Sequence, residues 1–414
     1  MSKPIITSTV AGYSLHWADE KLNIVVSRLK EHSDGTVKGE LKITTDAPGF
    51  NPHLYQAQFN FVSAQSRKSL ATTLLEKYAA WSWSDILEQL SVIVLTNVRR
   101  GELTEDLDPD LDIKAPAYLL SPVIVEGESN LIYGEGGSGK SLLALLFSQI
   151  IQANWWDNPF DLIIPKNVKI NTLYLDWETN SNIMAWRHQS ILKGMGRPFF
   201  KLKYRRCSAP LADDLEQIQE VIDATKTGFV VIDSAGMAAG GDLNKSETAT
   251  SFFKAIRKLK VTNLVISHTS KDQLTKKKTP FGSVYFFNES RSIWEVNHSV
   301  EEEGKLEVGM FHRKSNNSRL YHPIGFSFAF LEDLTMVESQ DVRDIVGFMK
   351  HLKLATQIEA LLKLGSLDKK RIAKELDAKP DSVRVTLYKM KKNQQVVELE
   401  NDEWGLPTKL TEVL

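Results

Sequence analysis

The sequence has little cysteine and no long apolar run. Its 414 residues include one cysteine, Cys207, which excludes an internal disulfide and is typical of a reducing compartment. No stretch approaches the roughly 18 consecutive apolar residues of a membrane-spanning helix, and the first residues lack the apolar centre of a secretory signal. We therefore expect a soluble, cytoplasmic protein that does not bind a membrane.

An excess of charge is also absent. The 51 lysines and arginines nearly balance the 52 aspartates and glutamates, so any contact with nucleic acid must come from local basic patches and not from the overall charge. We find no internal repeat and no low-complexity tract. The chain is long enough for two or three domains, each with its own core.

Residues 1–110 predict a small N-terminal α+β domain. Alternating apolar residues indicate strands, and two helical patterns follow them. These expected elements are Leu22–Leu29, Val37–Thr44, Tyr55–Phe61, Ser66–Ala80 and Ser84–Val98. The acidic, proline-containing stretch from Gly101 to Pro116 predicts a linker.

Residues 117–335 predict an α/β domain with a largely parallel sheet. Short apolar runs alternate there with amphipathic helical segments, which is the pattern of βαβ units. The expected strands are Asn130–Tyr133, Thr172–Leu175, Phe229–Ile232, Leu264–Ile266, Ser292–Val296 and Lys305–Phe311.

Residues 340–414 have a different pattern from the α/β segment before them. Three short helical segments begin near Ile358, Ser366 and Asp381, and a small hairpin is expected over Val396–Leu399 and Trp404–Leu406. Three helices followed by a β-wing predict a winged helix-turn-helix domain.

A glycine-rich segment follows the first core strand. Residues 134–141 (GEGGSGKS) fit the pattern G-x-x-x-x-G-K-[ST] of a phosphate-binding loop. Glycine is required because side chains would block the close approach of the backbone to a phosphate and disfavour positive φ. The helix expected over Leu142–Ala153 would point its N-terminus at the bound anion.

This loop predicts ATP and Mg²⁺ as cofactors. Lys140 can reach the β- and γ-phosphates, and the Ser141 hydroxyl can bind Mg²⁺. The other residues expected to bind nucleotide lie in the loop backbone: Gly134, Gly136, Gly137, Ser138 and Gly139.

Polar residues end three further core strands. Asp233 ends the apolar run Phe229–Ile232 and is the candidate second Mg²⁺ ligand, a Walker B aspartate. Glu178 and Asp176 compete for the role of water activator, because strand alternation would point both to the same side. His268 follows another apolar strand and could sense the γ-phosphate, although a lone histidine there is more often structural.

The ordered motifs GEGGSGKS, LYLDWE, VVIDS, GGDLN, VISHTSK, FGS and ESRSIW resemble the RecA-like ATPase core, specifically that of the RepA-type hexameric replicative helicases. The resemblance covers roughly residues 117–330. It implies that Glu178 is the catalytic glutamate, that His268 is a sensor and that Arg187 helps to position groups near the nucleotide.

The resemblance also implies a ring, most often a hexamer, in which the nucleotide lies between subunits. A neighbouring subunit then supplies positive charge to the transition state. The candidates for this role are Arg291, Arg313 and Lys314. The alternative interpretation of these three residues is that they are ordinary surface charges.

Two basic regions could bind DNA. The first contains Lys276, Lys277 and Lys278, and in RecA-like helicases the corresponding loop lines a central channel that holds single-stranded DNA. The second is the expected recognition helix of the winged domain, which could contact duplex DNA. Its candidate contacts are Arg384, Lys389, Lys391 and Lys392.

The sequence thus predicts an ATP-dependent, ring-forming DNA motor, a replicative helicase of a plasmid, phage or mobile element. One alternative is a DNA-binding regulatory or recombination-mediator ATPase without unwinding activity. Another is a partner-controlled ATPase whose winged domain docks a protein. A small-molecule kinase would leave Glu178, His268 and the basic loop unexplained.

Overall fold

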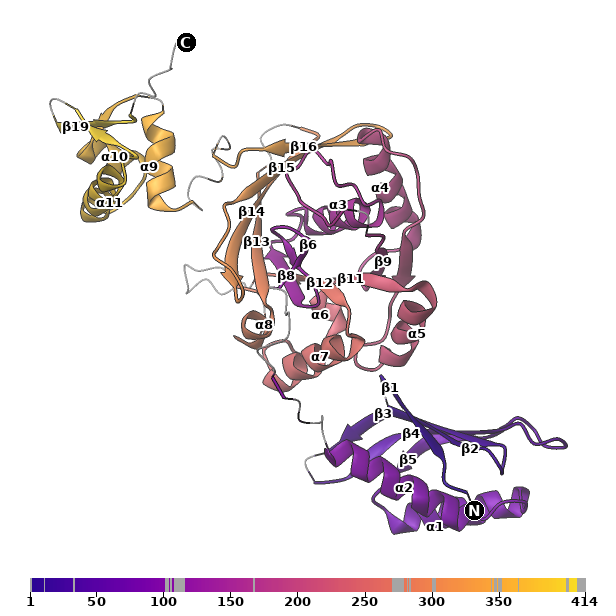
Figure 1. Ribbon diagram of the computed structural model, residues 1–414. Helices are drawn as coiled ribbons and strands as arrows, with labels where there is room; N and C mark the ends of the chain where they lie inside the picture. Colours follow the sequence, from indigo (N-terminus) through magenta and orange to yellow (C-terminus); the bar gives the residue numbers. More distant parts are fainter. Residues whose placement is uncertain are drawn as a thin grey trace. The chain divides into compact units, whose positions relative to one another are not determined.

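Figure 1 shows the computed structural model of the chain, which divides into two compact units. The first unit contains Met1–Ala115, Ala209–Lys226 and Ser251–Lys260, and the second contains Pro116–Ser208, Thr227–Thr250 and Val261–Leu414. The structure describes residues 2–10, 12–32, 34–100, 104, 106–107, 116–166, 168–269, 279–280, 282, 284–299, 303–343, 345, 348, 352–363, 365–399 and 402–407. Most of the predicted linker lies outside the described residues, and the three predicted domain ranges stay predictions.

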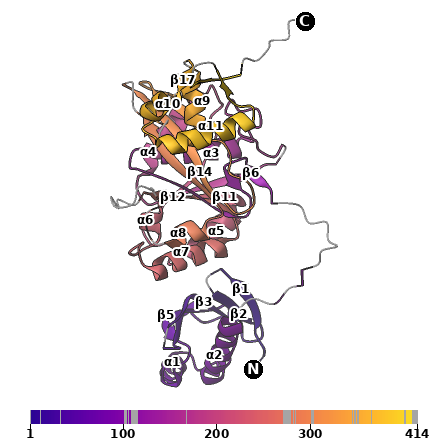
Figure 2. The same ribbon diagram turned by 90° about the vertical axis from the view of Figure 1, so that its left-hand side faces the viewer.

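The first unit contains an antiparallel sheet with the order β1-β2-β3-β4-β5. Its strands are β1 (Ile5–Thr9), β2 (Gly12–Trp17), β3 (Leu22–Glu31), β4 (Val37–Thr45) and β5 (His53–Asn60). Helices α1 (Ala64–Lys77) and α2 (Trp83–Arg100) lie on one face of this sheet (Figure 2). The three strands and two helices predicted here are confirmed, and β1 and β2 were not predicted.

The alternation of apolar and polar residues along β4 explains why one face of this sheet is buried. Val37, Leu41 and Ile43 point to the buried face of β4, while Lys38 and Lys42 between them remain partly exposed. The unit also includes α5 (Leu215–Thr225) and most of α7 (Ser246–Leu259).

The second unit is built on a sheet in which nine strands are described, in the order β10-β9-β11-β12-β8-β13-β14-β15-β16. The strands from β10 to β13 in this order run parallel, and β14 to β16 extend the sheet as antiparallel neighbours. Their bounds are β8 (Ser129–Gly134), β9 (Asn171–Asp176), β10 (Lys203–Arg206), β11 (Thr227–Asp233), β12 (Thr262–His268), β13 (Ser292–Ser299), β14 (Lys305–Ser315), β15 (Ile324–Phe330) and β16 (Thr335–Gln340). All six predicted core strands are present, and the predicted α/β class with a largely parallel sheet is confirmed.

The parallel strands place their carboxyl ends at one edge of the sheet. Asp233 of β11 aligns with Asp176 of β9, and His268 of β12 aligns with Gly134 of β8. The four predicted motifs therefore meet at this edge, as the sequence implied.

Helices cover both faces of this sheet (Figure 1). Helix α3 (Lys140–Gln152) contacts β8, β9, β11 and β12, and α6 (Ala235–Ala238) contacts β11 and β12 from the other side. Helix α4 (Ser181–Gly194) contacts β10 and β16, and α8 (Val284–Glu289) precedes β13. A short pair, β6 (Tyr118–Leu120) and β7 (Ile124–Val125), precedes β8.

The last part of the chain forms three helices beside a small sheet with the order β17-β19-β18 (Figures 1 and 2). The elements are α9 (Leu354–Leu362), β17 (Leu367–Asp368), α10 (Lys369–Glu375), α11 (Pro380–Lys392), β18 (Val397–Glu398) and β19 (Glu403–Gly405). Trp404, Ile358 and Leu387 are buried in the centre of this module. The predicted helices and hairpin are present.

His312 of β14 is a buried histidine that the sequence did not single out. Its ring stacks on Trp294 with a centroid distance of 4.3 Å, and its Nδ1 accepts the Tyr321 backbone N–H at 3.1 Å. Burial lowers the pKa of His312 to about 4. The ring is therefore neutral in the folded protein, because a proton on Nδ1 would oppose the Tyr321 N–H.

This pKa predicts acid sensitivity. An unfolded histidine binds its proton below about pH 6.5, whereas folded His312 resists protonation down to about pH 4. Stability is therefore lost as the pH falls through this window, by about 2 kcal/mol between pH 7 and pH 5. Urea unfolding followed by tryptophan fluorescence at both pH values measures this loss, and His312→Gln should show a flatter dependence. An equal slope in the variant would assign the acid sensitivity to other groups.

Candidate functional site

The phosphate-binding loop lies between β8 and α3, as predicted. Gly137 and Gly139 have φ values of 75° and 82°, the left-handed region in which a side chain is strained. Gly139 is also the N-cap of α3, so the first N–H groups of that helix face the loop. The local geometry is that of an anion site at a helix N-terminus.

Lys140 lies inside this loop. Its side chain is 5% exposed, and its Nζ donates to the carbonyl oxygens of Gly134 at 3.0 Å and Glu135 at 2.6 Å. Burial lowers the pKa of Lys140, while the nearby Asp233 and Glu178 carboxylates raise it. The ammonium is thus held at the centre of the cradle by backbone oxygens.

Asp233 ends β11 and is 4% exposed. The Tyr174 hydroxyl donates to its Oδ2 at 2.7 Å, and the Ser141 hydroxyl also hydrogen-bonds this carboxylate. Burial raises the pKa of Asp233 to about 6, and the two hydrogen bonds, which stabilise the carboxylate, oppose part of this rise. Tyr174 was not identified from the sequence, although its position two residues before Asp176 on the same strand was a usable signal.

The structure separates Asp176 from Glu178. The alternation argument was wrong here, because β9 ends at Asp176 and does not continue to Glu178. Asp176 is fully buried, and its carboxylate accepts the backbone N–H groups of Glu178 at 2.7 Å and Thr179 at 2.9 Å and the Tyr204 hydroxyl at 3.1 Å. Asp176 therefore shapes the turn after β9.

Glu178, by contrast, presents a carboxylate that is 43% exposed. The Ser234 hydroxyl donates to its Oε1, and the His268 Nε2 lies 3.6 Å from the same oxygen. The contact with His268 is the main cause that lowers the pKa of Glu178 to about 2, with further contributions from Ser234 and Lys140. Three neighbouring strands, β9, β11 and β12, thus bring their terminal polar groups to one point.

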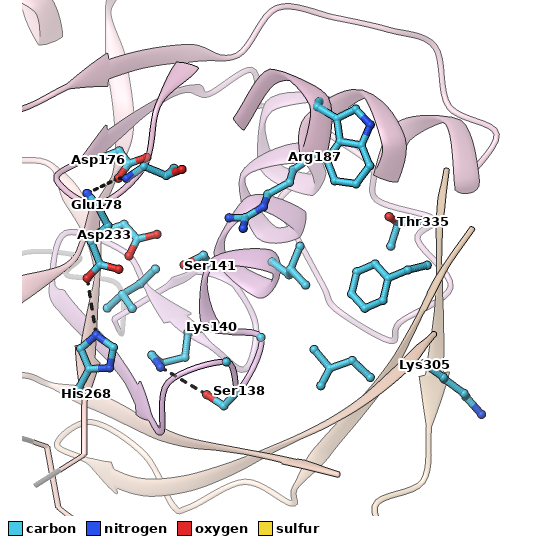
Figure 3. Close-up of a pocket in the computed structure, with 18 of the residues that line it drawn as sticks. Ser138, Lys140, Ser141, Asp176, Glu178, Arg187, Asp233, His268, Lys305 and Thr335 are labelled. Carbon is cyan, nitrogen blue, oxygen red and sulfur yellow. Dashed lines mark hydrogen bonds and ion pairs between the residues drawn. The ribbon is translucent and has the colours of Figure 1, made fainter. Parts of the chain in front are cut away.

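These residues line a cavity of about 750 Å³ (Figure 3). Glu178 and His268 lie at one end, Thr335 and Lys305 lie at the other, and Ser141 and Arg187 lie between them. Arg187 of α4 was expected near the nucleotide, and it lines the cavity.

Part of this lining was missed from the sequence. It comes from the start of β14 and the glycine before it, from the end of β15, from the start of β16 and from α4: Trp186, Gly304, Lys305, Leu306, Phe330 and Thr335. No local motif marks these residues, because only the order of strands in the folded sheet brings them to the loop.

Two of the three candidates for a role in a neighbouring subunit, Arg291 and Lys314, lie at the opposite edge of the sheet, whereas Arg313 contacts Glu295, which aligns with Tyr133 just before the loop. Ser292 of β13 aligns with Asn130 near the start of β8, and Lys314 aligns with Ile293. Arg291 and Lys314 are therefore several residues along the strands from their own phosphate-binding loop.

Each of these cations has a contact within the chain. Arg291 lies 3.7 Å from Glu128, and Arg313 donates to Glu295 at 2.6 Å. Lys314 Nζ donates to the carbonyl oxygens of Phe287, Asn288 and Ser290 and so binds the end of α8. Of the three, Lys314 has the most evident structural role.

The candidate DNA contacts fall in two groups. Lys276, Lys277 and Lys278 lie outside the described residues. Among the candidates on α11, Arg384 pairs with Asp381 at 3.2 Å and Lys391 pairs with Glu398 at 2.6 Å. Lys389 and Lys392 are exposed on the same helix.

Within the part of the chain that the structure describes, no helix is long and apolar enough to cross a membrane. The same residues contain no cluster of three or more His, Cys, Asp or Glu side chains that could hold a metal ion. A Mg²⁺ site built from Ser141, Asp233 and nucleotide phosphates would not form such a cluster.

Comparison with known proteins finds one family match and similar solved structures. Residues 97–274 match the family model of an AAA domain. Among solved structures, the KaiC-like protein from the hyperthermophilic archaeon Pyrococcus horikoshii is 16% identical, with a TM-score of 0.37 over 54% of this chain and 95% of that chain. No curated protein matches the sequence.

The family match includes the phosphate-binding loop, Glu178, Asp233 and His268. The predicted fold class, with its largely parallel sheet and small N-terminal domain, agrees with the observed architecture. The finer resemblance to RepA-type helicases stays a prediction. Residues 97–274 are therefore similar to an AAA domain, and they contain a phosphate-binding loop at the edge of a largely parallel sheet.

Proposed function

We propose that the protein hydrolyses ATP and uses the energy to act on DNA as a ring-forming motor, most specifically as a replicative helicase of a plasmid, phage or mobile element. The observation that carries the hydrolysis is the position of Glu178. Its half-exposed carboxylate lines the same cavity as Lys140 and Asp233, and it is held by Ser234 and His268.

One residue at the N-terminus of α3 and one at the end of β11 fit a magnesium ion. Ser141 and the buried Asp233 offer a hydroxyl and a carboxylate in hydrogen-bond contact, and hard oxygen ligands are those that Mg²⁺ prefers. When bound, Mg²⁺ would neutralise charge on the β- and γ-phosphates.

The remaining side chains of the cavity have separate roles in the proposed hydrolysis. Lys140 and the loop N–H groups bind the phosphates, and Glu178 orients the attacking water. His268, which contacts Glu178, is placed to respond to the γ-phosphate. Arg187 approaches from α4 and would hold the nucleotide against the loop.

A ring follows from the need for further positive charge at the transition state. Arg291 and Lys314 lie at the edge of the sheet away from their own loop, so any catalytic role they have is toward a neighbouring subunit, and Arg313 is the third candidate for that role. Since Lys314 binds the end of α8, we favour Arg291 or Arg313 as the group that acts in trans.

The DNA contacts of this proposal rest on the C-terminal module. We take helices α9 to α11 and the small sheet beside them as a winged helix-turn-helix, in which α11 would enter a groove of duplex DNA. Lys389 and Lys392, exposed on α11, would contact phosphates there. Single-stranded DNA would be held in a central channel by the segment that contains Lys276, Lys277 and Lys278.

The test is ATP hydrolysis by the purified protein with and without single-stranded DNA. We expect stimulation of about tenfold, a size typical of coupling between two sites. Unwinding of a forked duplex would then separate a helicase from a regulatory or recombination-mediator ATPase, which assembles on DNA without opening it. Hydrolysis that is indifferent to DNA would reject the DNA motor and favour a partner-controlled ATPase.

A further inference from the structure

The nucleotide cavity has an apolar end that phosphate binding does not explain. Trp186 of α4 and Phe330 of β15 both line it, and these residues are 51% and 39% exposed. Leu306 lines the same end. Aromatic surface of this size usually packs in a core, so its presence in a cavity calls for a planar apolar ligand.

This apolar end is continuous with the phosphate-binding loop. A Cβ added to Gly139 would lie 2.9 Å from the Val308 side chain and 3.3 Å from that of Leu306, so β14 packs directly on the end of the loop. A molecule whose phosphates bind at Lys140 would therefore extend along β14 toward Leu306 and Phe330. Figure 3 shows this direction, from Ser141 past Arg187 to Thr335.

The two walls of the apolar end are fixed to each other. Helix α4 packs on β16 so closely that a Cβ at Gly194 would lie 2.0 Å from the Thr335 carbonyl oxygen. The Ser190 and Thr335 hydroxyls also hydrogen-bond at 3.2 Å. Since Thr335 pairs with Phe330 across β15 and β16, this contact sets the position of α4, which carries Trp186, against Phe330.

We propose that Trp186 and Phe330 form the subsite for the base of the nucleotide, a planar aromatic heterocycle that stacks on one or both rings. The proposal rests on nucleotide binding at the loop and is independent of any role in DNA binding. A base that stacks on an aromatic side chain gains affinity from that contact. Removing the ring should therefore weaken binding roughly tenfold.

The experiment compares ADP with inorganic pyrophosphate, which share the diphosphate group but differ in the base. Calorimetric titration in the presence of Mg²⁺ should give tighter binding of ADP to the wild type. Trp186→Ala should weaken ADP about tenfold and leave pyrophosphate unchanged. Trp186→Phe should retain most of the ADP affinity, because it keeps an aromatic face, and Phe330→Ala should act in the same direction as Trp186→Ala.

Trp156 provides a matched control. It lies in the same compact unit, its side chain is 54% exposed, and it stacks under Lys166 at 4.5 Å without lining the cavity. Trp156→Ala should leave both affinities unchanged, and thermal melting of each variant checks its folding.

The outcomes separate this subsite from the proposed ATPase function. Equal binding of ADP and pyrophosphate by the wild type, or equal weakening of both by Trp186→Ala, would overturn the base subsite and leave phosphate binding intact. Failure of the wild type to bind either ligand would overturn both proposals.

Discussion

Replacing Glu178 with glutamine should reduce ATP hydrolysis by roughly 100-fold or more while ATP binding persists, because a group that activates or orients the water contributes about that factor. The amide keeps the size of the side chain and removes its charge. Single-turnover hydrolysis and equilibrium binding of ATP, measured on the same preparation, separate the two effects.

The structure indicates how Glu178 would act. With its pKa lowered to about 2, chiefly by the contact with His268, its carboxylate is ionised at neutral pH and is a weak base. That state favours orienting a water molecule over removing its proton. Hydrolysis should then depend on the contacts to His268 and Ser234, which hold Oε1 in place.

Asp176→Asn is the informative comparison for this result. Asp176 is buried and accepts two backbone N–H groups of the turn that carries Glu178, so its replacement should lower thermal stability as well as activity. If Glu178→Gln retained full activity while folded Asp176→Asn lost it, the assignment of the two carboxylates would have to be reversed.

The parallel core of the large sheet was predictable because buried parallel strands have near-continuous apolar sequences. β11, for example, contains Phe229–Ile232 before the polar Asp233, and β12 contains Leu264–Ile266 before His268. Each polar group at a strand end could therefore be located from sequence. Their meeting at one edge then follows from the parallel direction of the strands.

Other strands gave no such pattern. β10 (Lys203–Arg206) is a polar edge strand with a partly exposed tyrosine, and β1 (Ile5–Thr9) is an edge strand whose residues are largely exposed. With little burial there is little constraint on apolar spacing, so neither strand was predicted. β15 and β16 were missed as well, although β15 (Ile324–Phe330) is largely apolar.

The far end of the cavity depends on contacts between distant parts of the chain. Trp186 and Phe330 are 144 positions apart by their numbers, and they line one cavity only because β16 joins the sheet and α4 packs on it. The choice between Asp176 and Glu178 was undecidable from sequence for a local reason, since the residue at which β9 ends decides where each carboxylate lies.

Replacing Lys140 with methionine should weaken ATP binding by roughly 100-fold and so remove hydrolysis at moderate ATP concentrations. A hydrogen bond to a charged group contributes about 1.5–3 kcal/mol, and Lys140 is placed to make more than one to the phosphates. Methionine has a similar length and no charge, so it tests the ammonium and not the volume of the side chain.

The position of Lys140 also predicts what the variant does to folding. Its ammonium is buried with the carbonyl oxygens of Gly134 and Glu135, but burial lowers its pKa, which means that the interior of the loop disfavours the charge. Loss of the charge should therefore change the melting temperature little, in contrast to the large loss of binding. Lys193→Met, at an exposed lysine that pairs with Asp333 on the surface of the same unit, is the control and should bind ATP normally. Wild-type affinity in folded Lys140→Met would mean that the loop binds something other than a nucleoside triphosphate.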